Sequence, residues 1–331
     1  MQTQTKLDPA SASLAQTLIC AEMREVDAVI HRRLASDVVL INRIAQHIIG
    51  AGGKRIRPML VLLFAGALGF RGPERFELAA TVEFIHTATL LHDDVVDESA
   101  LRRGRQTANS LFGNSASVLV GDFVYSRAFQ MMVSINNMRV LEILADATNV
   151  IAEGEVLQLM NMHDPDLSVQ DYLRVIRFKT AKLFEASARI GAVLANANPK
   201  VEESCASFGR SLGTAFQLVD DLLDYEGATS ELGKNVGDDL REGKPTLPLL
   251  IAMERGSAAE RALIRAAIQN GEVDRLGDVV DIVRHTGAVA ATRAAARDEA
   301  DKASRNLNGL PPSVYRDALV DSCARSVERS F

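Results

Sequence analysis

The chain has 331 residues, 47% of them apolar, and a formal net charge of −6. This length and apolar content are sufficient for a large hydrophobic core. The mild acidity, without a basic tail or a stripe of Lys and Arg, argues against nucleic acid as a partner.

Helix-forming sequence dominates the chain from end to end, because Ala and Leu abound and strand-like alternation is scarce. Apolar periodicity predicts helices at residues 10–33, 36–50, 56–69, 74–98, 115–134, 138–161, 168–194, 199–225, 245–254, 258–269, 273–285, 287–308 and 312–328. The main breaks fall at 52–53, 71–73, 99–114, 164–165 and 226–244, and the last is long enough to suggest a lid. No shift in composition marks a boundary, so we expect one all-α domain over residues 1–331.

Several features of the sequence favour a cytoplasmic protein. The longest apolar stretch, from Pro58 to Phe70, has 13 residues, whereas about 20 are needed to span a bilayer. The first 16 residues lack the basic and apolar regions of a secretory signal. Cys20, Cys205 and Cys323 are far apart and suggest no disulfide framework. An oily product could still bring the protein transiently to a membrane.

Two Asp-Asp-x-x-Asp motifs end two of the predicted helices, at Asp93-Asp94-Val95-Val96-Asp97 and at Asp220-Asp221-Leu222-Leu223-Asp224. Because residues i and i+4 share a helix face, each motif presents a carboxylate pair. Such pairs within apolar sequence are unfavourable unless a cation lies between the carboxylates. Mg²⁺ suits them, since it binds carboxylates, water and substrate phosphates. One such motif is usually a solvated acidic face, but two in apolar surroundings favour a metal site between facing helices.

Basic residues stand where the predicted helices begin or end. The loop Gly52-Gly53-Lys54-Arg55-Ile56-Arg57-Pro58 runs into a helix N-terminus, which favours anions, and Pro58 suits a first helical turn. Arg clamps phosphate oxygens through two hydrogen bonds, and Lys adds a point charge. Other candidate phosphate contacts are His86, Arg102, Arg103, Lys179, Thr180, Lys234 and Lys244. Each also has an ordinary explanation as a packed residue, a helix end or an exposed loop.

These motifs, in this order, resemble those of the trans-isoprenyl diphosphate synthases. The strings that carry the resemblance are GGKRIRP, DDVVD, RRG, KT, FQLVDDLLD, GK and GKPT, and it is specific over about residues 46–253. EFIHTATLLHDDVVDES, FGNSASVLVGDFVYSRAFQMM and VIAEGEVLQLMN are similar to the long-chain branch. The resemblance implies an all-α helical bundle of the isoprenoid-synthase type around a central cavity. Residues 1–45 and 255–331 match only as helices.

The activity that the resemblance implies is a magnesium-dependent, head-to-tail condensation. Isopentenyl diphosphate would be added repeatedly to an allylic diphosphate, with farnesyl diphosphate the expected primer. The polyprenyl product would supply the side chain of ubiquinone or menaquinone. The resemblance also implies a homodimer.

The resemblance further implies roles for individual residues. Mg²⁺, with three ions per site and Mn²⁺ as a possible substitute, would be held by Asp93, Asp97 and Asp220, supported by Asp94, Asp221 and Asp224. The allylic diphosphate would be bound by Arg102, Lys179, Gln217, Lys234 and Lys244. Isopentenyl diphosphate would be bound by Lys54, Arg57, His86 and Arg103. Thr180 would line the reacting carbons, and catalysis would rest on Asp93, Asp97, Asp220, Lys179 and Arg102.

The residues before the first acidic motif should set the length of the product. Ala88 and Thr89, five and four residues before Asp93, are small where short-chain members of the family carry aromatics. A helical turn of about 5.4 Å is close to one isoprene unit, so the tail can pass Ala88 and reach Ile85. Candidates for the wall and floor on the next helix are Gly121, Tyr125, Phe129 and Met132, although plain core packing explains each equally well. We expect about eight units (octaprenyl, C40), with nine or ten open.

Two other functions share some of these features. A class I terpene cyclase also carries DDxxD, but its second motif usually ends in Glu after an Asn/Asp and a Ser/Thr, and it has no isopentenyl pocket. A non-catalytic subunit of a heteromeric prenyl synthase typically loses one acidic motif or its basic partners. Both motifs and the GGKRIRP loop are intact in this chain, which disfavours both alternatives.

Overall fold

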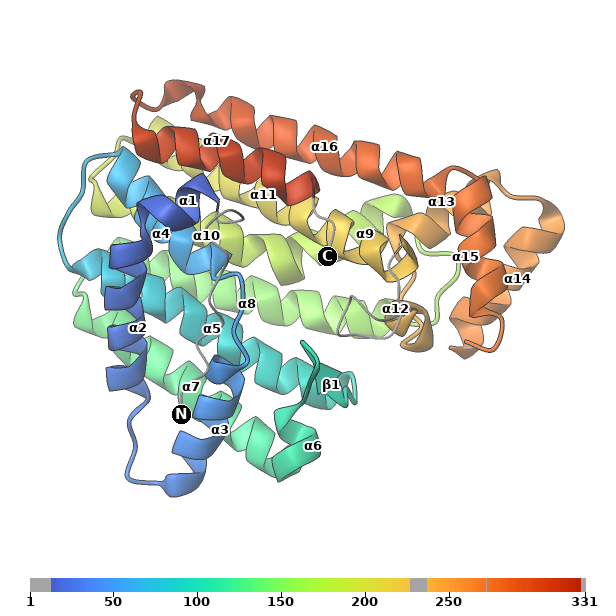
Figure 1. The fold of residues 1–331 in the computed structure, drawn as a ribbon, viewed down its shortest axis with the longest axis horizontal. Coiled ribbons are helices and arrows are strands. Elements are labelled where there is room, and N and C mark those ends of the chain that lie inside the picture. The colour runs from blue at the N-terminus through green and yellow to red at the C-terminus, as the bar shows by residue number, and fades with distance from the viewer. Residues whose placement is uncertain (1–12, 227–236, 272, 329–331) are drawn as a thin grey trace.

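The computed structural model describes residues 13–226, 237–271 and 273–328, and these residues fold as a helical bundle (Figure 1). Its first half comprises α1 (Leu14–Leu18), α2 (Cys20–Leu34), α3 (Val39–Gly50), α4 (Ile56–Ala67), α5 (Glu74–Val96), β1 (Leu101–Arg102), β2 (Arg105–Gln106), α6 (Ala108–Phe112), α7 (Asn114–Ser134), α8 (Met138–Asn161) and α9 (Val169–Ile176). Its second half comprises the π-helix η1 (Arg177–Ala181), α10 (Lys182–Leu194), α11 (Pro199–Glu226), α12 (Asp238–Arg241), α13 (Leu247–Arg255), α14 (Ala258–Asn270), α15 (Leu276–His285), α16 (Ala288–Asn306), the 3₁₀ turn η2 (Leu307–Gly309) and α17 (Val314–Val327). The prediction of an all-α fold is confirmed.

The predicted helices are present, and the differences lie at their interruptions. The helix expected at 10–33 is divided at Ile19 into α1 and α2. The break at 99–114 contains the antiparallel pair β1–β2, with Leu101 opposite Gln106, and then α6. The helix expected at 168–194 contains one π-helical turn, η1, between α9 and α10. These short elements depend on local turns and tertiary contacts, which periodicity does not report.

The long helices carry the two acidic motifs toward each other. α5 packs against α7 and α4, while α11 packs against α10 and α16. α10 contacts both α4 and α8, and so joins the two groups of helices. Figure 1 shows α16 and α17 lying along one side of this bundle, with α13, α14 and α15 at the end where the second acidic motif stands. The segment after residue 255 therefore covers α11 and shares the hydrophobic core with the first part of the chain.

Side-chain size and burial explain why these helices pack so closely. α4 is apolar on all sides, and every residue from Pro58 to Ala67 is buried. Its Phe64 meets Phe208 of α11 edge to face, with ring centroids 5.1 Å apart, a favourable geometry for aromatic pairs. α4 is thus a central helix of the bundle. Within the described ranges, no helix has both the length and the apolar character needed to cross a membrane.

Candidate active site

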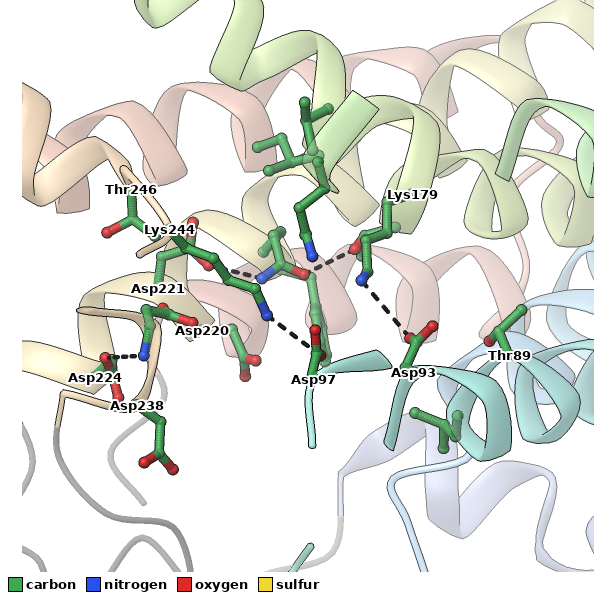
Figure 2. A pocket seen from close by; sticks show the side chains of 18 of the residues that line it. Thr89, Asp93, Asp97, Lys179, Asp220, Asp221, Asp224, Asp238, Lys244 and Thr246 are labelled. Carbon is green, nitrogen blue, oxygen red and sulfur yellow. Dashed lines mark hydrogen bonds and ion pairs between the residues drawn. The ribbon is translucent and has the colours of Figure 1, made fainter. Parts of the chain in front are cut away.

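The candidate site is a cavity of about 650 Å³ between the C-terminal halves of α5 and α11. The start of α4, α8, α9 with η1, and the segment from α12 to α13 complete its walls. Figure 2 shows the acidic side chains of α5 and α11 entering this cavity from opposite sides, with two lysines above them. The structure therefore brings together motifs that are far apart in the sequence.

The three aspartates of the first motif have different surroundings. Asp93 and Asp97 both line the cavity, as their spacing predicts. Asp94 turns away, is 1% exposed, and accepts a hydrogen bond from Nε of Arg102 at 2.7 Å. Burial raises the pKa of Asp93, and Lys179 opposes that shift. Burial likewise raises the pKa of Asp94, against the nearby Arg102 guanidinium.

The second motif divides in the same way. Asp220 is exposed to the cavity and has no hydrogen bond or ion pair to any described residue. Asp221 is buried, and Tyr172 and Gln217 donate to its two oxygens at 2.5 and 2.7 Å. Burial, and next the nearby Asp239, raise the pKa of Asp221 to about 8. Asp224 accepts the backbone N–H groups of Gly237 and Asp239 at 3.2 and 3.1 Å.

Two lysines neutralise the cavity-facing carboxylates of α5. Nζ of Lys179 lies 3.7 Å from Asp93 and 2.6 Å from Glu155 of α8. Nζ of Lys244 lies 3.3 Å from Asp97 and also pairs with Glu242. Burial lowers the pKa of Lys244, but the surrounding carboxylates, Asp97 first, outweigh burial and hold that pKa above its usual value. Both ammonium groups thus sit where a cation is favoured.

The π-helical turn η1 places Lys179 and Thr180 on the cavity wall. A π-turn widens a helix, so its neighbours must approach without side chains. Gly154 of α8 and Gly213 of α11 provide that space. A Cβ on Gly154 would lie 2.6 Å from the backbone nitrogen of Lys179, and one on Gly213 would lie 2.7 Å from Cα of Ala181. Glycine at these two positions therefore leaves room for the turn.

The predicted isopentenyl diphosphate pocket is a group of basic residues beside the acidic motifs. Lys54, Arg57, His86 and Arg103 all line the cavity. The Arg57 guanidinium lies over the ring of Phe184, 4.6 Å from its centroid, and its buried Nε has no hydrogen-bond partner among the described residues. Burial lowers the pKa of Arg57 to about 10. A bound anion would accept a hydrogen bond from this Nε and offset the buried positive charge.

His86 and Arg103 depend on the charges around them. Burial, and then the nearby arginines beginning with Arg57, lower the pKa of His86 well below its ordinary value. His86 is therefore a neutral hydrogen-bonding group at physiological pH. Burial also lowers the pKa of Arg103. Gly53 lies so close to Arg103 that an added Cβ would stand 2.6 Å from Nη1, which explains the second glycine of the loop.

The donor set fits a hard divalent cation that is shared with substrate. Asp93, Asp97 and Asp220 supply carboxylate oxygens from two sides of the cavity. Across the part of the chain that the structure describes, no three His, Cys, Asp or Glu side chains are close enough to hold a metal by themselves. Mg²⁺ typically takes one or two carboxylates and completes its shell with water and substrate phosphate. Facing carboxylates with space between them match that mode of binding.

The predicted chain-length residues divide between the cavity and the core. Thr89 lines the cavity and donates its hydroxyl to the carbonyl of His86 at 2.8 Å. Ala88, Ile85 and Met132 are fully buried in the hydrophobic core and do not line this cavity. Their proposed role therefore requires the growing tail to enter the packed space between α5 and α7. Tyr125 and Phe129 of α7 are half-buried, and their rings meet edge to face with centroids 5.1 Å apart.

Most of the other predicted residues also reach the cavity, including Arg102, Lys179, Thr180, Gln217 and Lys244. Lys234 lies outside the described residues. Sequence reasoning missed Glu155, Tyr172 and Glu83, all of which line the cavity. Glu155 stands in the EGEVLQL string that marked the long-chain branch, so a signal existed for it. Tyr172 stands seven residues before Lys179, two helical turns away, and nothing in its sequence context distinguishes it from a core aromatic.

Comparisons with known proteins agree on one family. The family model described as polyprenyl synthetase matches residues 38–284. Octaprenyl diphosphate synthase of Escherichia coli (strain K12) is 53% identical over 313 residues, which are 94% of this chain and 97% of that protein. All-trans-nonaprenyl-diphosphate synthase (geranyl-diphosphate specific) of Rhodobacter capsulatus is 44% identical over 94% of this chain and 96% of that protein.

A solved structure shows the same architecture. The polyprenyl synthase of Caulobacter crescentus CB15, crystallised with calcium and isoprenyl diphosphate, superimposes with a TM-score of 0.93. It is 47% identical, and the match covers 96% of this chain and 97% of that one.

Proposed function

Because the chain belongs to the polyprenyl synthetase family, we propose that it elongates an allylic diphosphate with successive isopentenyl diphosphate units to octaprenyl diphosphate. The observation that carries the proposal is the cavity in which Asp93 and Asp97 face Asp220 beside a separate group of basic residues. Two diphosphates must lie side by side in this reaction, and they repel each other. The carboxylate-lined half of the cavity, with its metal, would bind one diphosphate, and the basic half would bind the other.

The carboxylate-lined half is the proposed allylic site. A divalent metal, which we take to be Mg²⁺ as three ions, would neutralise the departing diphosphate there. The residues that would hold it are Asp93, Asp97 and Asp220, while Asp94, Asp221 and Asp224 are engaged by other protein groups. Lys179 and Lys244, now paired with Asp93 and Asp97, would transfer to the diphosphate oxygens. Fixed positive charge aimed at a leaving group is a large catalytic contribution.

The basic half is the proposed isopentenyl site. Arg57 and Arg103 would bind the diphosphate, and neutral His86 would donate one N–H to it. The double bond of isopentenyl diphosphate is then held next to the allylic carbon, so positioning replaces a random encounter. When the diphosphate departs, it leaves an allylic carbocation. Apolar cavity residues such as Leu90 and Phe216 exclude water from this carbocation. The departing diphosphate is the proposed base for the final proton, since we assign no side chain to that step.

The product length rests on the relatives and on the small residues of α5. The E. coli octaprenyl enzyme shares more identity with this chain than the R. capsulatus nonaprenyl enzyme does, which supports eight units and a role in supplying a quinone side chain. Replacing Ala88 by Phe should shorten the product to C15–C20, because the ring would fill the space under Asp93. Product length is read by reversed-phase chromatography after a thermal melt confirms folding. A folded Ala88→Phe enzyme that still makes C40 would contradict the assignment of Ala88.

The quaternary state that we propose is a homodimer formed through α7 and α8. Val156, Leu159 and Met160 form an exposed apolar stripe on α8, with fractional exposures of 57%, 59% and 73%. Leu119 of the neighbouring helix α7 is 68% exposed. Exposed apolar stripes of this kind are characteristic of protein interfaces. We also propose a cytoplasmic location, with transient membrane contact for product release.

One assay tests the proposed activity. The purified protein is incubated with farnesyl diphosphate, labelled isopentenyl diphosphate and Mg²⁺, and product length is measured. Incorporation by the protein alone, lost in Asp93→Ala and Asp220→Ala, is the expected result. No incorporation would reject the synthase, and incorporation only after a second protein is added would make this chain a partner subunit. Cyclised product without use of isopentenyl diphosphate would identify a terpene cyclase.

A further inference from the structure

Tyr172 of α9 is hydrogen-bonded to the second acidic motif. Its side chain is 4% exposed and lines the cavity. The hydroxyl donates its proton to Oδ2 of Asp221 at 2.5 Å. A hydroxyl has one proton to give, and in Tyr172 that proton is given to Asp221. Tyr172 therefore holds one oxygen of a buried carboxylate.

The other oxygen of Asp221 fixes the orientation of an amide. Nε2 of Gln217 donates to Oδ1 of Asp221 at 2.7 Å, so the NH₂ group of the amide faces Asp221. The carbonyl oxygen of Gln217 then faces the opposite way and accepts the hydroxyl proton of Thr180 at 2.8 Å. Gln217 and Thr180 both line the cavity. The chain of hydrogen bonds thus runs from α9 through α11 to the π-helical turn.

We propose that Tyr172 is a positioning residue for elongation, which sets the orientation of Gln217 and Thr180 beside the reacting carbons through Asp221. The inference rests on the proposed function and adds to it a residue that acts through Asp221. Without the phenol hydroxyl, Asp221 keeps Gln217 as a donor but loses the group that holds its other oxygen. The carboxylate can then rotate, and the Gln217 amide and the Thr180 hydroxyl rotate with it.

Tyr225 of α11, the helix that carries Asp221, provides a matched control. It is also fully buried, but its hydroxyl meets Thr246 at 3.5 Å and forms no hydrogen bond to a described carboxylate. Tyr225→Phe therefore removes the same group from a similar environment without breaking the Asp221 connection. A general loss of buried polarity would affect both variants, whereas the proposal concerns Tyr172 alone.

The test compares Tyr172→Phe, Tyr225→Phe, Thr180→Val and the double variant Tyr172→Phe/Thr180→Val. We expect Tyr172→Phe to lower kcat by at least tenfold, with KM for isopentenyl diphosphate changed less than threefold. Tyr225→Phe should stay within threefold of the native kcat. Because Tyr172 acts through Thr180, the double variant should lose far less than the product of the two single losses.

Three outcomes would overturn the proposal: a native kcat in folded Tyr172→Phe, an equal loss in Tyr225→Phe, or fully multiplicative losses in the double variant. If Tyr172→Phe does not fold, Thr180→Ser and Thr180→Val are compared in the otherwise native protein. The proposal requires Ser to retain kcat and Val to lose it, and equal kcat values would overturn it. Native protein that incorporates no isopentenyl unit would reject the proposed function instead, so the two failures are distinguishable.

Discussion

At the scale of single residues, adjacent aspartates of one motif have different surroundings. Asp93 and Asp97 face the cavity while Asp94, between them, is buried against Arg102. Such a division follows from helix geometry, since residues one turn apart share a face and the next residue does not. Local contacts also account for the second glycine of the basic loop, which lies against Arg103, and for the raised pKa of Glu155. Each of these contacts yields a prediction.

Gly53→Ala should weaken the binding of isopentenyl diphosphate. Gly53 has φ +156°, and a Cβ there would displace the Arg103 guanidinium. A hydrogen bond to a charged group contributes about 1.5–3 kcal/mol, so we expect KM for isopentenyl diphosphate to rise roughly tenfold or more. Gly52→Ala is the control, because φ there is +74° but no atom lies within 4 Å of the added Cβ. Equal KM values in the two variants would show that backbone strain alone matters.

The stability of the metal-free protein should fall as pH rises from about 5 to 7. Burial, opposed by Lys179, raises the pKa of Glu155 to about 7. The folded state therefore retains a proton there that the unfolded chain loses near its ordinary pKa of about 4.5. This contribution to stability is present at low pH and is lost as pH rises through the folded pKa, with a slope of at most about 1.4 kcal/mol per pH unit.

Thermal melts between pH 5 and 8 with a chelator measure this effect. Glu155→Gln cannot titrate, so its melting temperature should depend less on pH over that interval than that of the native protein. Glu153→Gln, an exposed glutamate on the same helix, is the control. An unchanged pH dependence in Glu155→Gln would assign the titration to another group such as Asp221, whose pKa is raised to about 8.

At the scale of elements, the second acidic motif also positions the segment that returns to the cavity. Asp224 accepts the N–H groups of Gly237 and Asp239, at the start of α12. The backbone N–H of Lys244 then donates to the carbonyl of Asp239 at 2.8 Å. Lys244 in turn reaches Asp97 of the first motif. The third aspartates of the two motifs therefore have different surroundings, although the sequence repeats them identically.

Replacing Asp224 should reveal that difference. Asp224 uses one oxygen for each of two N–H groups, so Asn keeps an acceptor for one of them, whereas Ala removes both. We therefore expect Asp224→Asn to stay within about fivefold of native kcat/KM for the allylic diphosphate, and Asp224→Ala to fall further as Lys244 loses its position. Asp220→Asn is the reference for loss of a metal-facing charge and should be far less active. If Asp224→Asn is as inactive as Asp220→Asn, then the charge of Asp224 acts on the metal directly.

At the scale of the whole molecule, the helices after residue 255 complete the core rather than the site. α16 and α17 cover α11 on one side (Figure 1), and none of their residues lines the cavity. The exposed apolar stripe lies elsewhere, on α8, beside the exposed Leu119 of α7. Its exposure is explained if a second copy of the chain covers it, because a symmetric interface pairs the same patch from each copy.

Leu159→Glu combined with Met160→Glu should produce a monomer. Each substitution places a carboxylate in the proposed interface, and symmetry brings like charges together. Light scattering coupled to size exclusion measures the mass. Val314→Glu, at a 58% exposed position on α17, should leave the mass unchanged. A dimer that survives the double substitution would place the interface on another surface.

The sequence by itself determined the fold class and the chemistry of the site. Apolar periodicity located the long helices, because burial on one face repeats with the helical turn. The spacing of Asp93 and Asp97 was sufficient to place both on one face, and the order of the motifs identified the family. These features are local in the chain, so they could be read without coordinates.

Only the tertiary structure decided how the groups are divided among tasks. In the folded protein, Asp224 is hydrogen-bonded to the backbone at the start of α12, Asp221 to Tyr172, and Lys179 to Glu155. The tertiary structure also introduced the π-helical turn, which needs Gly154 and Gly213 from two other helices. Each of these contacts joins residues distant in sequence, and their burial and charge exist only after the helices have packed. Identical DDxxD motifs therefore acquire different roles from their neighbours, which a repeated pattern cannot encode.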